Sequence, residues 1–200
     1  MKQILFLVVL FGSGSLAAQN EEKWRAGLDL YWAGIDSAYR DTLHSPLPLE
    51  DRKTFSHLPR FEADPTYRVN ARYEPIAGEV FGMKTSTERE PKYQAVGKLY
   101  FTLAGKEEQL TVYRNIDLSR LDDYRNYLFV PFTDLTNGES TYGGGRYLDL
   151  EGPLQADVEL DFNRAYNPYC AYGGRYSCPI PPEENHLEVA VRAGVLKHHD

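Results

Sequence analysis

The chain is poor in the side chains that most enzymes use. Its 200 residues include two cysteines, two methionines and five histidines. The histidines do not fall at the spacing of a zinc site. No recognisable pattern pairs a nucleophile with a general base. We therefore expect no metal and no cofactor, and the sequence favours a non-catalytic protein while leaving an enzyme open.

Positive charge is also scarce. The chain has 22 lysines and arginines against 29 acidic residues, which gives a formal net charge of -7. Nucleic-acid binding needs a basic surface, and so does binding to anionic membranes. We therefore expect no nucleic-acid partner. After the first twenty residues no apolar run is long enough to cross a bilayer as a helix, so we expect no membrane span.

The first eighteen residues have the pattern of a secretory signal peptide. Lys2 supplies the positive start, residues 4–11 form a short apolar run, and small residues lead to Ala17 and Ala18. Cleavage after Ala17 or Ala18 would release the chain into the periplasm or outside the cell. The alternative is a buried N-terminal helix, and the order of charge, apolar run and small residues favours the signal.

An amphipathic helix is predicted for residues 19–45. Trp24, Leu28, Tyr31 and Ile35 recur near helical spacing, and two prolines at 46 and 48 end the pattern. Residues 46–196 then form a single β-rich domain, and residues 197–200 are a short tail.

Strand patterns fill the β-rich domain. They cover residues 67–73, 80–85, 93–103, 109–114, 127–132, 146–150, 158–162 and 186–193. A turn at 104–107 joins two of them as a hairpin, and the wholly apolar 127–132 is predicted to be a central strand. The connections contain no helical crossovers, so the sheet is predicted to be antiparallel. The predicted fold is mainly β, an antiparallel sandwich or partly closed barrel of about eight strands with one N-terminal amphipathic helix.

Tyrosine is unusually common, with 15 copies. Tyrosine suits half-buried strands, and it also stacks on sugars and flat ligands. Because the tyrosines are spread along the whole chain, the sequence favours the structural interpretation.

Both cysteines lie near the C-terminus. In an oxidising compartment Cys170 and Cys178 are predicted to form a disulfide that closes a small loop. A metal site would need further ligands, with His186 the nearest candidate, and a nucleophilic cysteine would need a nearby base. The disulfide is favoured over both.

Polar residues gather between 132 and 194. The candidate binding cluster consists of Asp134, Tyr142, Arg146, Asp161, Asn163 and Asn185. In the structural alternative, Arg146 and Asp161 form a buried ion pair completed by Asn163, and Asp134 caps a turn.

The same stretch carries a family resemblance. Its motifs are Phe132-Thr-Asp-Leu-Thr136, Gly145-Arg-Tyr-Leu-Asp149, Leu160-Asp-Phe-Asn-Arg-Ala-Tyr-Asn-Pro168 and Cys178-Pro-Ile-Pro-Pro182. In these pieces the chain resembles the domain of unknown function 1684 family, and the likeness extends loosely back to about Leu43. The resemblance implies a secreted or periplasmic bacterial protein and implies no activity.

Three hypotheses for function follow. The favoured one is non-catalytic binding of a small polar ligand, an envelope glycan or a protein partner, with Tyr142, Arg146, Asp161 and Asn163 as the polar floor of a cleft. The second is a hydrolase of glycans or esters, in which Asp161 or Glu139 is the acid or base and Arg146 orients the substrate. In the third, the polar cluster serves the fold alone.

Overall fold

The structure is a computed structural model that describes residues 13–41 and 43–198. A long helix, α1 (Ser13–Arg40), is followed by a short one, α2 (Leu49–Thr54). The predicted helix at 19–45 therefore exists but begins earlier and ends sooner. The predicted signal peptide lies largely outside the described residues, as does half of the predicted tail. Within the described ranges no helix has the length and apolar character needed to span a membrane.

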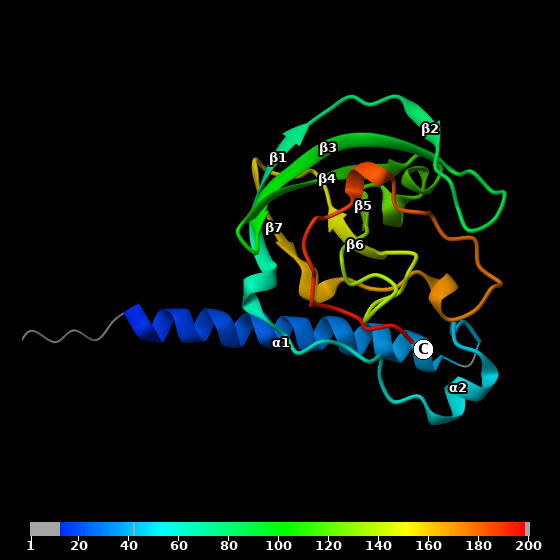
Figure 1. Cartoon of the computed structure of the whole chain (residues 1–200), viewed down its shortest axis with the longest axis horizontal. Helices are drawn as coiled ribbons and strands as arrows, with labels where there is room; N and C mark the ends of the chain where they lie inside the picture. Colours follow the sequence, from blue (N-terminus) through cyan, green and yellow to red (C-terminus); the bar gives the residue numbers. More distant parts are fainter. Residues whose placement is uncertain (1–12, 42, 199–200) are drawn as a thin grey trace, which may run out of the picture.

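One antiparallel sheet makes up the body of the protein. Its seven strands are β1 (Arg68–Pro75), β2 (Val80–Gly82), β3 (Lys92–Leu103), β4 (Lys106–Asn115), β5 (Tyr127–Phe132), β6 (Arg146–Glu151) and β7 (Asp157–Asp161). The strand order is β6-β5-β4-β3-β1-β7, and β2 pairs with β3. The sheet curls into a half-barrel with α1 lying along one side (Figure 1). The mainly β fold with a partly closed barrel and one N-terminal helix is thus confirmed.

The hairpin of β3 and β4 is the longest pairing in the sheet. Leu103 pairs with Lys106 across the two-residue turn Ala104–Gly105, and both turn residues have positive φ, 50° and 80°. Two such residues match the twist of paired strands. The register shifts between Ala95 and Gly97, which marks a β-bulge and lets one strand serve both faces of the sheet.

The predicted strand at 186–193 is wrong. This segment contains no strand and makes only one isolated bridge, between His186 and Thr133. It runs inside the half-barrel, where Leu187, Val189 and Val191 join the main core (Figure 1). Apolar side chains therefore alternate here because the chain fills the barrel, not because it pairs in a ladder.

Strand β5 is buried on both faces, in keeping with its wholly apolar sequence. Leu128, Val130 and Phe132 belong to the main core. Phe129 projects from the opposite face into a second, aromatic cluster that also contains Tyr147. Phe129 pairs with Asp149 of β6, and directly opposed residues in antiparallel strands share a face. This second face becomes important for the candidate site.

Helix α1 docks through a third cluster built on its own buried residues, which include Trp24, Leu28, Trp32 and Tyr39. The indole nitrogens fix its position. Trp24 Nε1 donates to Asp161 Oδ2 at 2.7 Å, and Trp32 Nε1 donates to the Asn163 carbonyl at 3.1 Å. The helix is thereby joined to the end of β7 and the turn that follows it.

Candidate functional site

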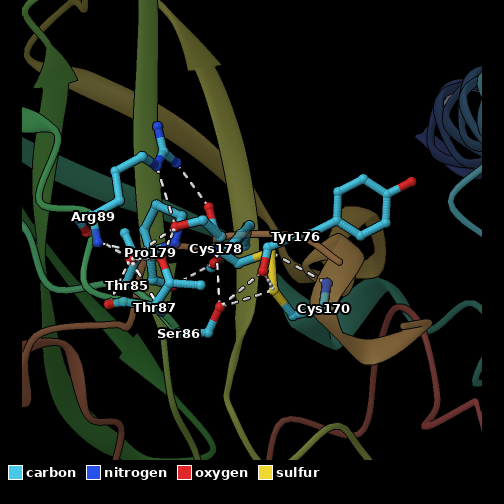
Figure 2. Close-up of a disulfide and its surroundings, with 10 residues drawn as sticks. Thr85, Ser86, Thr87, Arg89, Cys170, Tyr176, Cys178 and Pro179 are labelled. Carbon is cyan, nitrogen blue, oxygen red and sulfur yellow. Dashed lines mark hydrogen bonds between the residues drawn. A yellow bond between two sulfur atoms is a disulfide. The ribbon is translucent and has the colours of Figure 1, made fainter. Parts of the chain in front are cut away.

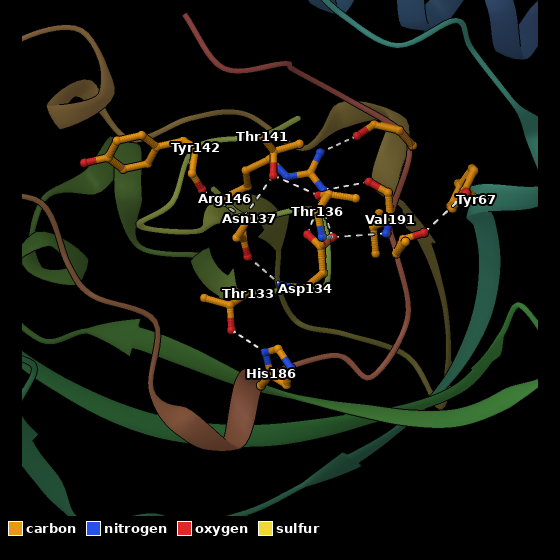
Figure 3. A network of polar contacts seen from close by, with 12 residues as sticks. Tyr67, Thr133, Asp134, Thr136, Asn137, Thr141, Tyr142, Arg146, His186 and Val191 are labelled. Carbon is orange, nitrogen blue, oxygen red and sulfur yellow. Dashed lines mark hydrogen bonds and ion pairs between the residues drawn. The ribbon is translucent and has the colours of Figure 1, made fainter. Parts of the chain in front are cut away.

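Arg146 lies at the centre of a buried polar network with no exposed surface of its own (Figure 3). Its Nη2 donates to Asp134 Oδ2 and to the Val191 carbonyl, both at 2.8 Å, and its Nη1 donates to the Ala193 carbonyl. Burial lowers the pKa of Arg146, and the charge of Asp134 opposes that shift. The guanidinium thus ties the C-terminal segment to β6.

Asp134 completes this network from the other side. Its Oδ1 accepts from Thr136 N at 2.9 Å, from Thr136 Oγ1 at 2.6 Å and from Val191 N at 3.1 Å. The predicted turn capping by Asp134 is therefore present. Each oxygen of the carboxylate serves the fold, and none is free for a ligand.

Asp161 and Asn163 form a separate network. Asp161 Oδ1 accepts from Asn163 N at 3.0 Å and from Asn163 Nδ2 at 2.8 Å, while Oδ2 faces Trp24. The ion pair suggested between Arg146 and Asp161 is wrong, because Arg146 pairs with Asp134 at 2.8 Å. Asp161 lies at the end of β7 and bonds instead to Trp24 and Asn163.

The last two predicted residues lie elsewhere. Asn185 is fully buried and holds β4 to β5, because its Nδ2 donates to the Pro131 carbonyl at 2.7 Å and its Oδ1 accepts from Thr111 N at 2.7 Å. Tyr142 is half-buried, and its carbonyl accepts from Asn137 Nδ2 at 2.9 Å. The six predicted residues are thus distributed over several structural networks and do not line one cleft.

A different part of the molecule contains a ligand-sized cavity. It has a volume of about 480 Å³ and lies between α1, the second face of the sheet and segment 166–179. Aromatic side chains dominate its lining: Tyr31 and Tyr39 from α1, Phe129 from β5, and Tyr147 from β6 are examples. We call it the aromatic cavity. Its volume falls within the range of about 300–1,000 Å³ that is usual for ligand pockets.

The rings of the aromatic cavity hold each other in place. The rings of Phe129 and Tyr147 meet edge to face with centroids 4.7 Å apart, and Tyr93 lies 5.7 Å from Phe129. Tyr147 also meets Tyr166 at 5.8 Å, and its hydroxyl donates to the Pro179 carbonyl. These contacts fix ring orientation without a ligand, so the cavity is preformed.

Asp149 is the charged residue of the described cavity lining. Its Oδ1 accepts from the hydroxyls of Tyr127 and Tyr166, each at 2.7 Å. The side chain remains accessible to solvent, while the surrounding protein crowds its carboxyl. Burial raises the pKa of Asp149, and the two tyrosine hydrogen bonds partly oppose the increase. A carboxylate is thus positioned on an aromatic wall.

The predicted disulfide between Cys170 and Cys178 is present, and it borders this cavity (Figure 2). Ser86 Oγ lies 3.1 Å from Cys170 Sγ and accepts from Cys178 N at 3.1 Å. Arg89 Nη2 donates to the Ser177 carbonyl at 2.8 Å. The loop after β2 therefore braces the disulfide segment from outside.

The aromatic cavity was not predicted from the sequence, because its tyrosines are spread along the chain and also suit half-buried strands. The sequences of two predicted strands did contain residues that could have indicated part of the cavity. Pairing of 127–132 with 146–151 places Tyr127, Phe129, Tyr147 and Asp149 on one face. The tyrosines from α1 and from 166–179 could not be added, because only the tertiary fold brings them to that face.

The described residues contain no group of three or more histidine, cysteine, aspartate or glutamate side chains able to hold a metal ion.

The fold and the cavity define a class of protein: a β half-barrel with a long docked N-terminal helix and an aromatic cavity between them. The chain belongs to the family described as Protein of unknown function (DUF1684), whose model matches residues 53–196.

A solved structure is similar to the chain over most of its length. The chain is 38% identical to an uncharacterized protein of Haloarcula marismortui whose solution NMR structure is known. The match has a TM-score of 0.71 and covers 90% of this chain and 99% of the other. No curated protein matches the chain.

Proposed function

We propose that this protein is a non-catalytic binding protein that takes up a small molecule in the aromatic cavity. The observation that carries the proposal is the cavity of about 480 Å³, lined by rings that are oriented before any ligand arrives. Ligand sites are typically concave and largely apolar with a few placed polar groups. Here Asp149 is the charged polar group.

The polar networks around Arg146 and Asp161 have a structural role in this proposal. Arg146 has no exposed surface, and Asp161 is only 8% exposed with both carboxylate oxygens hydrogen-bonded. In this arrangement Arg146 cannot orient a substrate. The geometry therefore does not favour the hydrolase hypothesis, although Glu139 is exposed.

We also propose that the chain works in the periplasm or outside the cell, after removal of the predicted signal peptide at residues 1–18. The disulfide between Cys170 and Cys178 supports this, because such bonds persist in oxidising compartments. The exposed side chains at 17–22 and the first buried contact at Trp24 also support it, since cleavage would leave the docked part of α1 intact.

The proposed binding can be tested by titrating the protein with a library of amines, sugars and small acids while recording the NMR signals of its tyrosine rings. We expect at least one compound to shift the rings of Tyr127, Tyr147 and Tyr166 in a saturable way. Substitution of Ala38→Trp places an indole in the cavity lining and should weaken that binding at least tenfold.

Ala26→Trp is the matched control, because Ala26 is exposed on the same helix and does not line the cavity. It should leave the titration unchanged. The proposal is refuted if no compound shifts these rings, or if Ala26→Trp and Ala38→Trp weaken binding equally. Turnover of chromogenic glycosides or esters by the purified protein would favour the hydrolase hypothesis instead.

A further inference from the structure

The aromatic cavity contains a carboxylate without a counter-ion. Within 13–41 and 43–198, no lysine, arginine or histidine forms an ion pair with Asp149. The tyrosines that bond to it both donate to Oδ1, so Oδ2 has no protein partner among the described residues. Because the Asp149 side chain is exposed, Oδ2 can be reached by a ligand that enters the cavity.

Positive groups near the cavity are already engaged. The guanidinium of Arg164 lies 5.4 Å from the Tyr31 ring and 3.8 Å from Asp161. Arg89 donates to the Ser177 carbonyl. Neither belongs to the cavity lining. Asp149 is therefore the charged group of the described lining, and it is bordered by aromatic faces, which carry negative charge density of their own.

Four tyrosine hydroxyls of the cavity lining already donate to protein acceptors. Each tyrosine hydroxyl has a single proton. Those of Tyr127 and Tyr166 go to Asp149, that of Tyr147 goes to the Pro179 carbonyl, and that of Tyr31 goes to the Arg164 carbonyl at 2.9 Å. A sugar needs donors for its hydroxyl oxygens, and an anion needs donors or positive charge. These four rings offer neither.

From this arrangement we propose that the aromatic cavity binds a small organic cation with a methylated ammonium group, and that Asp149 is its counter-ion. This inference rests on the proposed binding function and names its ligand class. Aromatic faces attract cations, and aromatic cages commonly recognise quaternary ammonium groups. A primary ammonium is more strongly hydrated, so it loses more on entering a cavity lined by aromatic rings.

The sharpest test compares two ligands of the same shape. Choline carries the quaternary nitrogen, and 3,3-dimethyl-1-butanol replaces that nitrogen with carbon and is neutral. Each is titrated into the purified protein at neutral pH while the rings of Tyr127 and Tyr166 are followed by NMR. We expect choline to bind at least tenfold more tightly than the neutral isostere. Equal affinity would overturn the inference.

Two variants test whether Asp149 is the counter-ion of the bound cation. Asp149→Asn keeps the size of the side chain and an oxygen for the two tyrosine hydroxyls, and it should weaken choline binding at least tenfold. Asp157→Asn is the matched control, because Asp157 is exposed on β7 and lies outside the cavity. It should leave affinity unchanged. Undiminished choline binding by folded Asp149→Asn contradicts the role of Asp149 as counter-ion.

The failure of this inference can be told apart from failure of the proposed function. If N-acetylglucosamine or a small acid binds saturably at the same rings and choline does not, the inferred cationic ligand is wrong, but the cavity is still a binding site. If ethanolamine binds more tightly than choline, the inferred preference for a methylated ammonium group is wrong. If no compound of the library shifts the NMR signals of the cavity rings, both proposals are refuted.

Discussion

At the scale of single residues, Arg146 and Asp134 form a fully buried ion pair in the fold. Both side chains are fully buried, and each makes several hydrogen bonds, although Arg146 Nε has no partner among the described residues. Taking a charge out of water is expensive, and the mutual attraction repays it only with good geometry and further hydrogen bonds. The network meets that condition because it also bonds the backbone of Val191, which places the C-terminal segment inside the half-barrel.

Replacing Arg146 tests this account. Arg146→Met leaves the Asp134 carboxylate buried without its counter-charge, and removal of one partner from such a pair typically costs about 3–5 kcal/mol. We expect the free energy of unfolding, measured with urea, to fall by that amount. Arg125→Met is the control, since Arg125 forms an exposed pair with Asp122 and should change stability little. A loss below about 1 kcal/mol for Arg146→Met would contradict the account.

The structural alternative predicted from the sequence placed Arg146 in a buried ion pair but gave it the wrong partner. The residue types and the region were predictable, because charges in an apolar strand pattern need partners. The choice between Asp134 and Asp161 depends on strand order, since Asp134 follows β5 directly and β5 pairs with β6. Antiparallel order is not encoded in periodicity, so the partner could not be derived.

At the scale of elements, strand patterns predicted all seven strands and failed on the segment at 186–193. Alternation records which side chains are buried, and burial also arises without a ladder. Leu187 and Val191 are buried against the inside of the half-barrel, and Asp134 and Arg146 satisfy part of the segment's backbone. An isolated alternating segment at the end of a chain therefore predicts burial more safely than it predicts a strand.

The disulfide segment is the element that completes the aromatic cavity. Tyr169 directly precedes the loop closed by Cys170 and Cys178, Tyr176 lies within it, and their ring centroids lie 5.2 Å apart. Both rings line the cavity. The crosslink restricts the same short loop that carries them, so its contribution to stability and its contribution to the cavity are coupled.

Removing the crosslink should affect both properties. Cys170→Ala with Cys178→Ala should lower the free energy of unfolding by less than about 3 kcal/mol, because the closed loop is short. We also expect broadened NMR signals from the rings of Tyr169 and Tyr176. Reductant should reproduce both effects in the natural chain and change nothing in the double variant. Sharp, unshifted rings in the double variant would show that the cavity does not depend on the crosslink.

At the scale of the whole molecule, the aromatic cavity places function and stability in opposition. Asp149 is exposed to solvent but has no positively charged partner among the described residues. Burial raises the pKa of Asp149 above its ordinary value. Sites shaped for a ligand commonly reduce stability in this way, and substitutions that relieve the strain also remove function.

The direction in which Asp149 changes folding stability with pH follows from its raised pKa. Because the folded-state pKa of Asp149 is raised, the folded protein takes up the proton more readily than the unfolded chain does. The stability associated with this group is full below the unfolded pKa, about 3.9, and is lost as pH rises through the folded pKa. Burial also raises the pKa of Tyr31, Tyr127, Tyr147 and Tyr166, so these cavity hydroxyls stay neutral throughout that window.

Asp149→Asn should therefore be more stable than the natural chain at pH 7, although it binds choline less well. Urea unfolding of both proteins at several pH values isolates the group, because all other titrating groups are shared. The stability advantage of the variant should shrink as pH falls through the raised pKa, and choline affinity of the natural chain should fall over the same range. If the variant is instead less stable at pH 7, the tyrosine hydrogen bonds outweigh burial, and Asp149 is held by the fold and does not wait for a ligand.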